Sequence, residues 1–396
     1  MCALKNGIGT TFSLIVCTIA ALMSLEFVGA APMLIQQPSA PPPAPMPSGP
    51  TVLPDGYVKF MLNAPRATEV MLNLQNSIGP SPAADPMAMR KDAAGVWSAT
   101  VGPLKPDWYG YGFILDGVKI ADPQNRDIWS GATSAWSYVL VPGPEANFFA
   151  DESVPHGAWG TVRYFSKVAN KERQMQVYTP PGYGRDNVRY PVLYLMHGGG
   201  GNDTDWIVCM RANYIMDNLI AQKKVKPMMM VMPDGYVTPP TVLEGVTDPF
   251  PEELLGSIVP TIEQNYRVQA GGTNRALAGL SLGGRWTMDT LILHPGAFAY
   301  IGTFSARWAS ATREDLVKNH SSLLTNPELN KNTKLFWITI GGPEDTGRPG
   351  ALDDMLATRA LFDRHKINYK FVQGTGGHTW QVWRRNLWDF AQFLFR

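Results

Sequence analysis

The stretch "NRALAGLSLGGRW", residues 274–286, places one serine between glycines directly after a small apolar run. Gly279, Ser281 and Gly283 match the pattern Gly-x-Ser-x-Gly, a sharp strand-to-helix turn that holds serine in a strained backbone conformation. Small neighbours are needed there because side chains would collide. The following helix N-terminus favours the negative charge of an attacking hydroxyl. We predict that Ser281 is a nucleophile; a purely structural glycine-rich turn is the alternative.

A nucleophilic serine needs a general base, and two of the six histidines follow apolar runs beside glycines. His378, in "QGTGGHTW", comes after the last predicted strand and after Ser281, in the chain order serine, acid, histidine. We predict that His378 is the base. The other candidates fall in a linker, a polar stretch or at helix ends, where solvated or structural roles are expected: His156, His294, His320 and His365.

His197, the second of these histidines, opens the loop "HGGGGNDTDW". Its glycines allow backbone N–H groups to face a cavity, so we predict that the N–H groups of Gly199 and Leu282 form an oxyanion hole. A loop that combines His197 with Asp203 and Asp205 could instead hold a metal ion or a phosphate, and this alternative stays open.

The acid that orients the base should follow the apolar run 334–342, where "PEDTG" supplies both Glu344 and Asp345. Either carboxylate could hold the imidazole in the correct tautomer and stabilise its charged form. The spacing does not choose between them.

These groups need a scaffold that brings strand ends together. Apolar runs alternate with helix-like segments after about residue 154, which predicts a mostly parallel sheet covered on both faces. Ligands bind at the carboxyl ends of the strands in such a sheet. Strands are expected at 190–198, 227–235, 274–281, 298–305, 334–342 and 369–374, helices at 252–266, 285–294 and 351–366, and two leading antiparallel edge strands near 160–168 and 174–179.

The residues before this α/β domain divide into three parts. Residues 1–30 are predicted to be a secretory signal peptide, because an apolar run from Phe12 to Met23 precedes a small-residue pattern that ends at Ala30. An uncleaved membrane anchor is the alternative. Residues 31–50 are rich in proline and are expected to form an extended linker.

Residues 51–150 show short alternating strands with frequent turn residues, which predicts an all-β sandwich. Its aromatic residues could form a sugar-binding platform, but core packing is the favoured interpretation: Trp97, Trp108, Tyr109 and Tyr111.

Composition narrows the function further. The 396 residues carry a formal net charge of +1, with acidic and basic residues mixed, so nothing indicates a nucleic-acid partner. Cys2 and Cys17 lie in the predicted signal peptide, which leaves Cys209 alone in the mature chain. An intramolecular disulfide is therefore not expected, and we predict that Cys209 is a core residue.

Several motifs occurring in order resemble one known family. The motifs are "YTPPGY", "RYPVLYLMHGGGGNDTDW", "PMMMVMPDGY", "NRALAGLSLGG" and "GGHTWQVWRRNLWDFAQFLF". Together they look like the esterase D-like and feruloyl-esterase family of α/β-hydrolases, a family that also includes acetyl-xylan esterases, enterochelin esterases and mycolyltransferases. The resemblance covers residues 155–396. The preceding β module resembles an immunoglobulin-like, early-set domain.

The resemblance implies that Ser281 is the nucleophile, His378 the base and Asp345 the acid, with no metal and no organic cofactor. One departure concerns the pocket: relatives often have Gly-Gln after the glycine pair of the elbow, whereas this chain has Arg285 and Trp286. The shape of the acyl pocket is therefore expected to differ.

These observations give a working hypothesis: a secreted or periplasmic serine carboxylic-ester hydrolase that forms an acyl-enzyme and acts on feruloyl or acetyl esters of xylan. The side chains expected to bind substrate are His197, Trp206, Trp286 and Trp380, with Tyr236 and Trp308 also near predicted strand ends. The alternatives are an acyltransferase, a siderophore or polyester esterase of the same fold, and a carbohydrate-binding protein with a degenerate esterase domain. The expected partner is a small-molecule or polysaccharide-linked ester, without stable membrane insertion after signal cleavage.

Overall fold

The structure is a computed structural model that describes residues 49–74, 86–131, 135–185, 187–237, 248–342 and 350–396. The predicted signal peptide and nearly all of the predicted linker lie outside the described residues. Residues 46–396 form one compact unit. Among the described helices, none has both the length and the apolar content that crossing a membrane requires.

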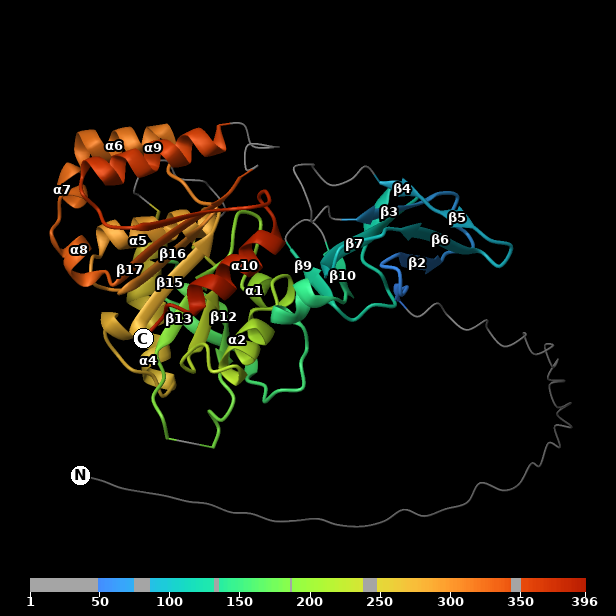
Figure 1. Cartoon of the computed structure of the whole chain (residues 1–396), viewed down its shortest axis with the longest axis horizontal. Helices are drawn as coiled ribbons and strands as arrows, with labels where there is room; N and C mark the ends of the chain where they lie inside the picture. Colours follow the sequence, from blue (N-terminus) through green and yellow to red (C-terminus); the bar gives the residue numbers. More distant parts are fainter. Residues whose placement is uncertain (1–48, 75–85, 132–134, 186, 238–247, 343–349) are drawn as a thin grey trace, which may run out of the picture. The chain divides into compact units, whose positions relative to one another are not determined.

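An eight-stranded sheet forms the centre of the C-terminal part (Figure 1). The first two strands run antiparallel to their neighbours and the other six run parallel, as the sequence predicted. In spatial order the strands are β11 (Ala158–Ser166), β12 (Lys171–Thr179), β14 (Met229–Pro233), β13 (Val192–Met196), β15 (Arg275–Leu280), β16 (Tyr300–Phe304), β17 (Leu335–Gly341) and β18 (Lys370–Gly374).

Both faces of this sheet are buried, and each faces its own core. Successive side chains of a strand point to opposite faces, so Val192, Tyr194 and Met196 of β13 lie in one core and Leu193 and Leu195 lie in the other. Every residue of β13 is buried. This double burial explains why the strands are continuous apolar runs instead of alternating ones.

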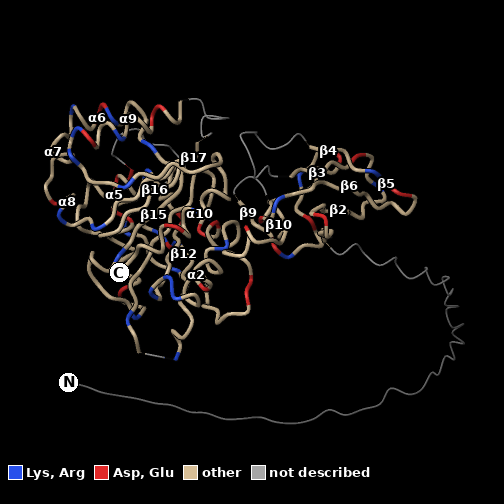
Figure 2. The backbone as a smooth tube through the Cα atoms, in the orientation of Figure 1, with Lys and Arg blue, Asp and Glu red and all other residues tan. Residues whose placement is uncertain are grey.

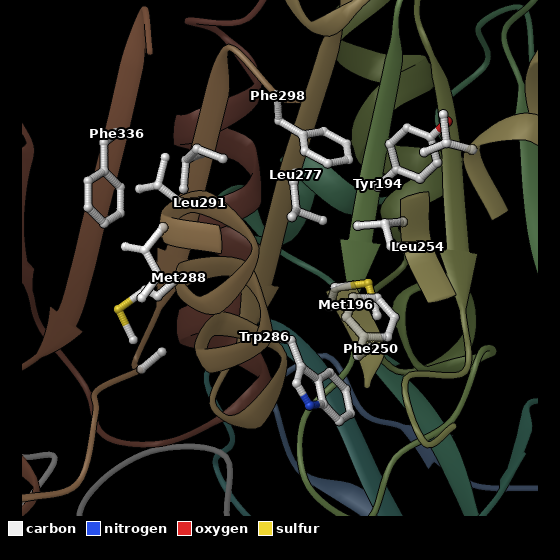
Figure 3. Close-up of a cluster of buried hydrophobic side chains, with 14 of the residues drawn as sticks. Tyr194, Met196, Phe250, Leu254, Leu277, Trp286, Met288, Leu291, Phe298 and Phe336 are labelled. Carbon is white, nitrogen blue, oxygen red and sulfur yellow. The ribbon is translucent and has the colours of Figure 1, made fainter. Parts of the chain in front are cut away.

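The first core is covered by helices from the middle and late parts of the chain. Figure 3 shows Trp286, Met288 and Leu291 of the helix after β15 beside Leu277 of β15 and Phe336 of β17. The elements on this face are α3 (Phe250–Glu253), η2 (Leu254–Ile258), α4 (Val259–Asn265), α5 (Leu282–Leu293), α6 (Ser310–Asn319), α7 (Ser321–Leu324), α8 (Glu328–Asn332) and α9 (Ala351–Arg364).

The predicted helix at 252–266 is present as the continuous run α3, η2 and α4, with a π-helical turn at η2. Pro260 follows this turn and has no N–H for an i→i−4 hydrogen bond. A wider turn immediately before the proline accommodates the missing donor. The helix therefore stays continuous through Pro260.

The second core is covered by α1 (Asp205–Val208), α2 (Ala212–Ala221) and α10 (Trp380–Ala391). Two short 3₁₀ segments, η1 (Pro144–Phe149) and η3 (Gly272–Asn274), complete the helical elements of the described chain.

Residues 51–141 form two antiparallel sheets with a hydrophobic cluster of their own. The assignment to an immunoglobulin-like class stays a prediction. One sheet has the order β1 (Thr51–Val52), β2 (Val58–Asn63), β6 (Val96–Val101) and β5 (Arg90–Lys91). The other has the order β4 (Met87–Ala88), β3 (Val70–Leu74), β7 (Asp107–Leu115), β10 (Ala135–Val141) and β9 (Ile128–Ser130), with β8 (Val118–Ile120) paired to β7.

The four aromatic residues that the sequence singled out in this β module are core residues. Trp97, Trp108, Tyr109 and Tyr111 are at most 7% exposed, which confirms the packing interpretation and removes these four as a sugar platform. Trp108 also belongs to the second core of the eight-stranded sheet, as do four other buried residues of 51–154: Trp129, Tyr138, Ala146 and Phe149. The β module and the α/β domain therefore share a core, although the sequence pattern changes between them.

A buried ion pair joins the same two parts. Arg384 of α10 is fully buried, and its Nη1 lies 2.8 Å from Oδ1 of Asp107 on β7. Burial raises the pKa of Asp107 and lowers that of Arg384, while their mutual attraction opposes both shifts.

Elsewhere, basic and acidic residues are interspersed over the described chain, as Figure 2 shows.

Cys209 lies in the second core, which confirms the prediction. Its Sγ accepts a hydrogen bond from the Tyr138 hydroxyl at 3.1 Å. Burial raises the pKa of the thiol well above its usual value, so the cysteine is an unreactive packing residue.

Candidate active site

Ser281 stands at the junction between β15 and α5 with a backbone conformation that few non-glycine residues adopt. Its φ is 50° and its ψ is −116°. The Ser281 N–H donates to the carbonyl of Phe304 at the end of β16, at 2.8 Å, which anchors the turn to the neighbouring strand. A strained residue held by its surroundings is typical of functional sites.

The glycines around Ser281 are required by close backbone approach. A Cβ at Gly279 would lie 2.3 Å from the carbonyl carbon and oxygen of Gly283. A Cβ at Gly283 would lie 2.3 Å from the carbonyl oxygen of His197 and 2.7 Å from Cβ of Met196. A side chain at Gly279 would force apart the strand and the helix start of the elbow, and one at Gly283 would push the elbow away from the end of β13. The pattern Gly-x-Ser-x-Gly is therefore a packing requirement of this turn.

His378 follows β18 and meets Ser281 at the carboxyl ends of the strands. Its Nε2 lies 3.0 Å from the Oγ of Ser281, within hydrogen-bonding distance. The structure thus brings together the two residues that the sequence predicted as nucleophile and base, which are 97 positions apart in the chain.

Trp383 supports the imidazole and was missed by the sequence analysis. Its ring packs edge-on against His378, with ring centroids 4.8 Å apart and an interplanar angle of 90°. The Trp383 Nε1–H donates to the Oγ of the buried Ser305 at 3.0 Å, which fixes the indole. The feature of the sequence that could have indicated this role is the position of Trp383 in the first turn of the helix that follows His378.

Glu344 and Asp345 lie outside the described residues. The strand before them, β17, ends at Gly341, which pairs with Gly374 of β18 shortly before His378. The choice of the acid stays a prediction.

The two N–H groups predicted for an oxyanion hole belong to segments on either side of Ser281. Leu282 is the first residue of α5, where N–H groups have no carbonyl partner one turn earlier. Gly198 comes close to the serine, since a Cβ at Gly198 would lie 3.4 Å from that of Ser281. The next residue, Gly199, is exposed with no atom within 4 Å of its Cβ position.

His197 is buried, with 1% of its surface exposed, and both ring nitrogens contact protein atoms. Nδ1 lies 2.8 Å from the Gly198 carbonyl, and the Gly235 N–H donates to Nε2 at 2.9 Å. Burial opposes the charged ring, but the hydrogen bond with Asp234 and the nearby charge of Asp205 outweigh it and raise the pKa of His197. This corrects the prediction that His197 binds substrate: the side chain joins two loops.

The alternative of a metal or phosphate loop receives no support from the donor atoms. Oδ2 of Asp203 accepts hydrogen bonds from the side-chain amides of Gln174 and Gln176, at 3.1 and 2.8 Å. Oδ1 of Asp205 accepts one from the indole N–H of Trp129 at 2.8 Å. In the part of the chain that the structure describes, no three His, Cys, Asp or Glu side chains are grouped to hold a metal ion.

Two tryptophans predicted to bind substrate are core residues. Trp206 and Trp286 are each 1% exposed. Trp286 lies beside Phe250 (Figure 3). The two rings stack with their centroids 5.2 Å apart, and the Trp286 Nε1–H donates to Asp248 at 2.7 Å. The prediction for these two side chains was wrong because residues of other segments cover them.

The remaining aromatic candidates for substrate binding differ in how much of their surface is exposed. Trp308 is fully buried, whereas Tyr236 is half-buried, and its hydroxyl accepts the Gly200 N–H at 2.7 Å. Trp380 is also half-buried and meets Trp383 edge-on at 5.3 Å between centroids. Trp380 and Tyr236 thus keep accessible surface, and their role in binding substrate stays a prediction.

Residues 166–394 match the protein family described as "Putative esterase". The chain belongs to this family. Among curated proteins, an endo-1,4-beta-xylanase/feruloyl esterase from Xylanibacter ruminicola is 32% identical over 88% of this chain and 46% of its own length. Endo-1,4-beta-xylanase Y from Acetivibrio thermocellus is 24% identical over 57% of this chain and 22% of its own. The chain thus spans less than half the length of these two relatives.

Solved structures share the α/β-hydrolase fold of this esterase family member. A CE1 ferulic acid esterase from Anaeromyces mucronatus matches with a TM-score of 0.52 and 22% identity, over 65% of this chain and 98% of that one. An enterobactin esterase from Shigella flexneri matches with a TM-score of 0.61 and 16% identity, over 87% and 96%. Because the second match covers 87% of this chain, it extends beyond residues 155–396 into the residues that precede them.

The elbow glycine Gly283 gives a test of the packing requirement. We expect Gly283→Ala to lower the free energy of unfolding by about 1–3 kcal/mol, because the new methyl group overlaps the backbone of His197. Gly256→Ala is the matched control, since its Cβ position has no atom within 4 Å and alanine is the better helix former. Thermal unfolding should show a lower Tm for the first variant and an unchanged or higher Tm for the second; equal values would contradict the requirement.

Asp289 is a buried acid on α5, the helix that begins after Ser281. Its Oδ1 accepts the Trp308 indole N–H at 2.8 Å, and its Oδ2 lies 3.6 Å from Nε of Arg285. Burial raises the pKa of Asp289 to about 7, against the lowering effects of Arg285 and Trp308. Over a range of pH, Asp289 is therefore protonated in the folded state and ionised in the unfolded chain.

This raised pKa predicts a pH-dependent stability. Between the usual pKa of 3.8 and the folded value of about 7, folding binds a proton at Asp289, so stability falls as pH rises through this window. Asp289→Asn cannot ionise, and we expect it to make the decline between pH 4 and 7 shallower. Urea unfolding of both proteins at several pH values measures the difference; parallel profiles would show that Asp289 does not contribute.

Proposed function

We propose that the protein is an exported serine carboxylic-ester hydrolase that works through an acyl-enzyme. The Oγ of Ser281 attacks the ester carbonyl while Nε2 of His378 takes its proton, and Asp345 orients the imidazole. The observation that carries the proposal is the 3.0 Å contact between Ser281 Oγ and His378 Nε2 at a strained strand-to-helix turn.

The two half-reactions balance on these groups. In the first, the Ser281 oxygen bonds to the carbonyl carbon, and His378 passes the proton to the leaving alcohol as the C–O bond breaks. In the second, water attacks the acyl-serine, His378 takes the proton of the water, and the acid leaves as Ser281 regains its hydrogen. The Gly199 and Leu282 N–H groups would donate to the oxyanion in both steps.

The proposed substrates are feruloyl or acetyl esters on xylan. The relative with 32% identity is named an endo-1,4-beta-xylanase/feruloyl esterase, and a second relative is named a xylanase. Trp380 is half-buried and packs on Trp383, the ring that contacts His378, and it offers an apolar surface to a phenolic acyl group. Export is part of the proposal because of the apolar leader-like residues 1–30.

Siderophore-ester hydrolysis is a second candidate. The Shigella flexneri enterobactin esterase matches 87% of this chain, a larger share than the ferulic acid esterase covers. At 16% identity this likeness supports the fold alone, so the candidate is tested beside the first with an enterobactin-type triester.

The nucleophile assignment is tested with two esters. We expect the wild-type protein to hydrolyse p-nitrophenyl acetate and methyl ferulate, and Ser281→Ala to lose both activities while keeping its circular dichroism spectrum and Tm. Retained turnover in Ser281→Ala would remove the serine mechanism. Turnover of acetate without ferulate would keep the mechanism and move the substrate towards acetylated sugars.

The acid is tested by neutral isosteres. We expect Asp345→Asn to reduce kcat by up to ~10⁴-fold, because the amide favours the wrong tautomer of His378. Glu344→Gln should change kcat little. The opposite ranking in steady-state kinetics would reassign the acid to Glu344.

A further inference from the structure

The β module contacts the loop that carries Gly199. Trp129 lies on β9, and its Nε1–H donates to Oδ1 of Asp205 at 2.8 Å. On the same strand, the carbonyl of Ser130 accepts a hydrogen bond from Nδ2 of Asn202 at 2.8 Å. Two hydrogen bonds thus connect β9 to the loop 198–205, from residues more than 70 positions earlier in the chain.

Asp205 transmits this contact to the glycines. Its Oδ1 also accepts the Asn202 N–H at 3.1 Å, which closes the loop on itself. A Cβ at Gly201 would lie 2.1 Å from Oδ2 of Asp205, so the carboxylate sits directly against the loop backbone. The Gly201 N–H donates to the Gly198 carbonyl at 3.2 Å, and Gly199 lies inside this turn.

Trp129 is itself rigidly held. It is 7% exposed in the second core, and it pairs with Trp136 of β10 in the antiparallel register. Asp205 is fully buried, so the hydrogen bond between the two side chains is shielded from water. A shielded bond between two packed groups fixes position better than an exposed contact between loops.

We propose that the β module is a positioning element of the active site, in which Trp129 and Ser130 fix the 198–205 loop so that the Gly199 N–H faces the oxyanion. The inference rests on the proposed function, since this negative charge develops when Ser281 or water adds to the acyl carbonyl. Trp129 does not touch the reacting atoms and acts through Asp205. The role differs from carbohydrate binding, for which the buried ring of Trp129 offers no surface.

The test compares two tryptophans of the β module with equal burial. Trp129 and Trp97 are both 7% exposed, and Trp97 Nε1 donates to the Ala64 carbonyl within the module. Trp129→Phe and Trp97→Phe each remove one indole hydrogen bond, but only the first bond reaches the 198–205 loop. Active sites are titrated with a fluorophosphonate, so that kcat is expressed per reactive serine and a smaller folded fraction does not count as slower chemistry.

We expect Trp129→Phe to lower kcat per titrated site for p-nitrophenyl acetate by about tenfold or more with KM nearly unchanged, because displacing an oxyanion donor weakens transition-state binding. Trp97→Phe should stay within twofold of wild type. If Trp129→Phe does not fold, Asn202→Asp decides: it removes the amide donor to Ser130 while keeping the Oδ1 that accepts the Thr204 N–H.

Two outcomes overturn different statements. Wild-type values of kcat per site in Trp129→Phe, or in Asn202→Asp where the first variant does not fold, would overturn the positioning role and leave the proposed function intact. An inactive wild-type protein, or activity that survives Ser281→Ala, would overturn the proposed function itself.

Discussion

The constraint on which the active site depends is the close contact between the backbone after β15 and the backbone at the end of β13. A Cβ at Gly283 would lie 2.3 Å from the carbonyl oxygen of His197 and 2.7 Å from that of Met196, so this position has no room for a side chain. This crossing fixes where Ser281 stands and where the loop after His197 starts. The approach of His378 from β18 to Ser281 depends on that geometry, because the serine is presented at the strand ends by the same turn.

The sequence predicted the placement of residues correctly where that placement depends on local backbone geometry. The glycines around Ser281 and the chain order of Ser281 and His378 report backbone geometry and topology, which leave a direct trace in the residues. Trp206 and Trp286 were assigned wrongly to the pocket because their burial depends on segments distant in sequence. Asp248 binds the indole of Trp286, and nothing in its own neighbourhood indicates this partner.

The domain boundary shows the same limit in a different form. Periodicity changes from strand-like to strand-and-helix after about residue 154, and this change predicts a domain boundary there. Periodicity reports the type of secondary structure and does not report which core a side chain enters. Trp108, Trp129 and Tyr138 belong to strands of the β module, yet they complete the core under α1, α2 and α10.

This shared core limits where the chain can be divided without exposing apolar side chains. The two xylanase-named relatives are each more than twice as long as the region they share with this chain, so in them the region occurs within a larger polypeptide. Recombination that cut between residues 150 and 155 would carry away one wall of a hydrophobic core and expose the apolar side of α10. In this chain, the piece that keeps both of its sheet cores intact is therefore the β module together with the α/β domain.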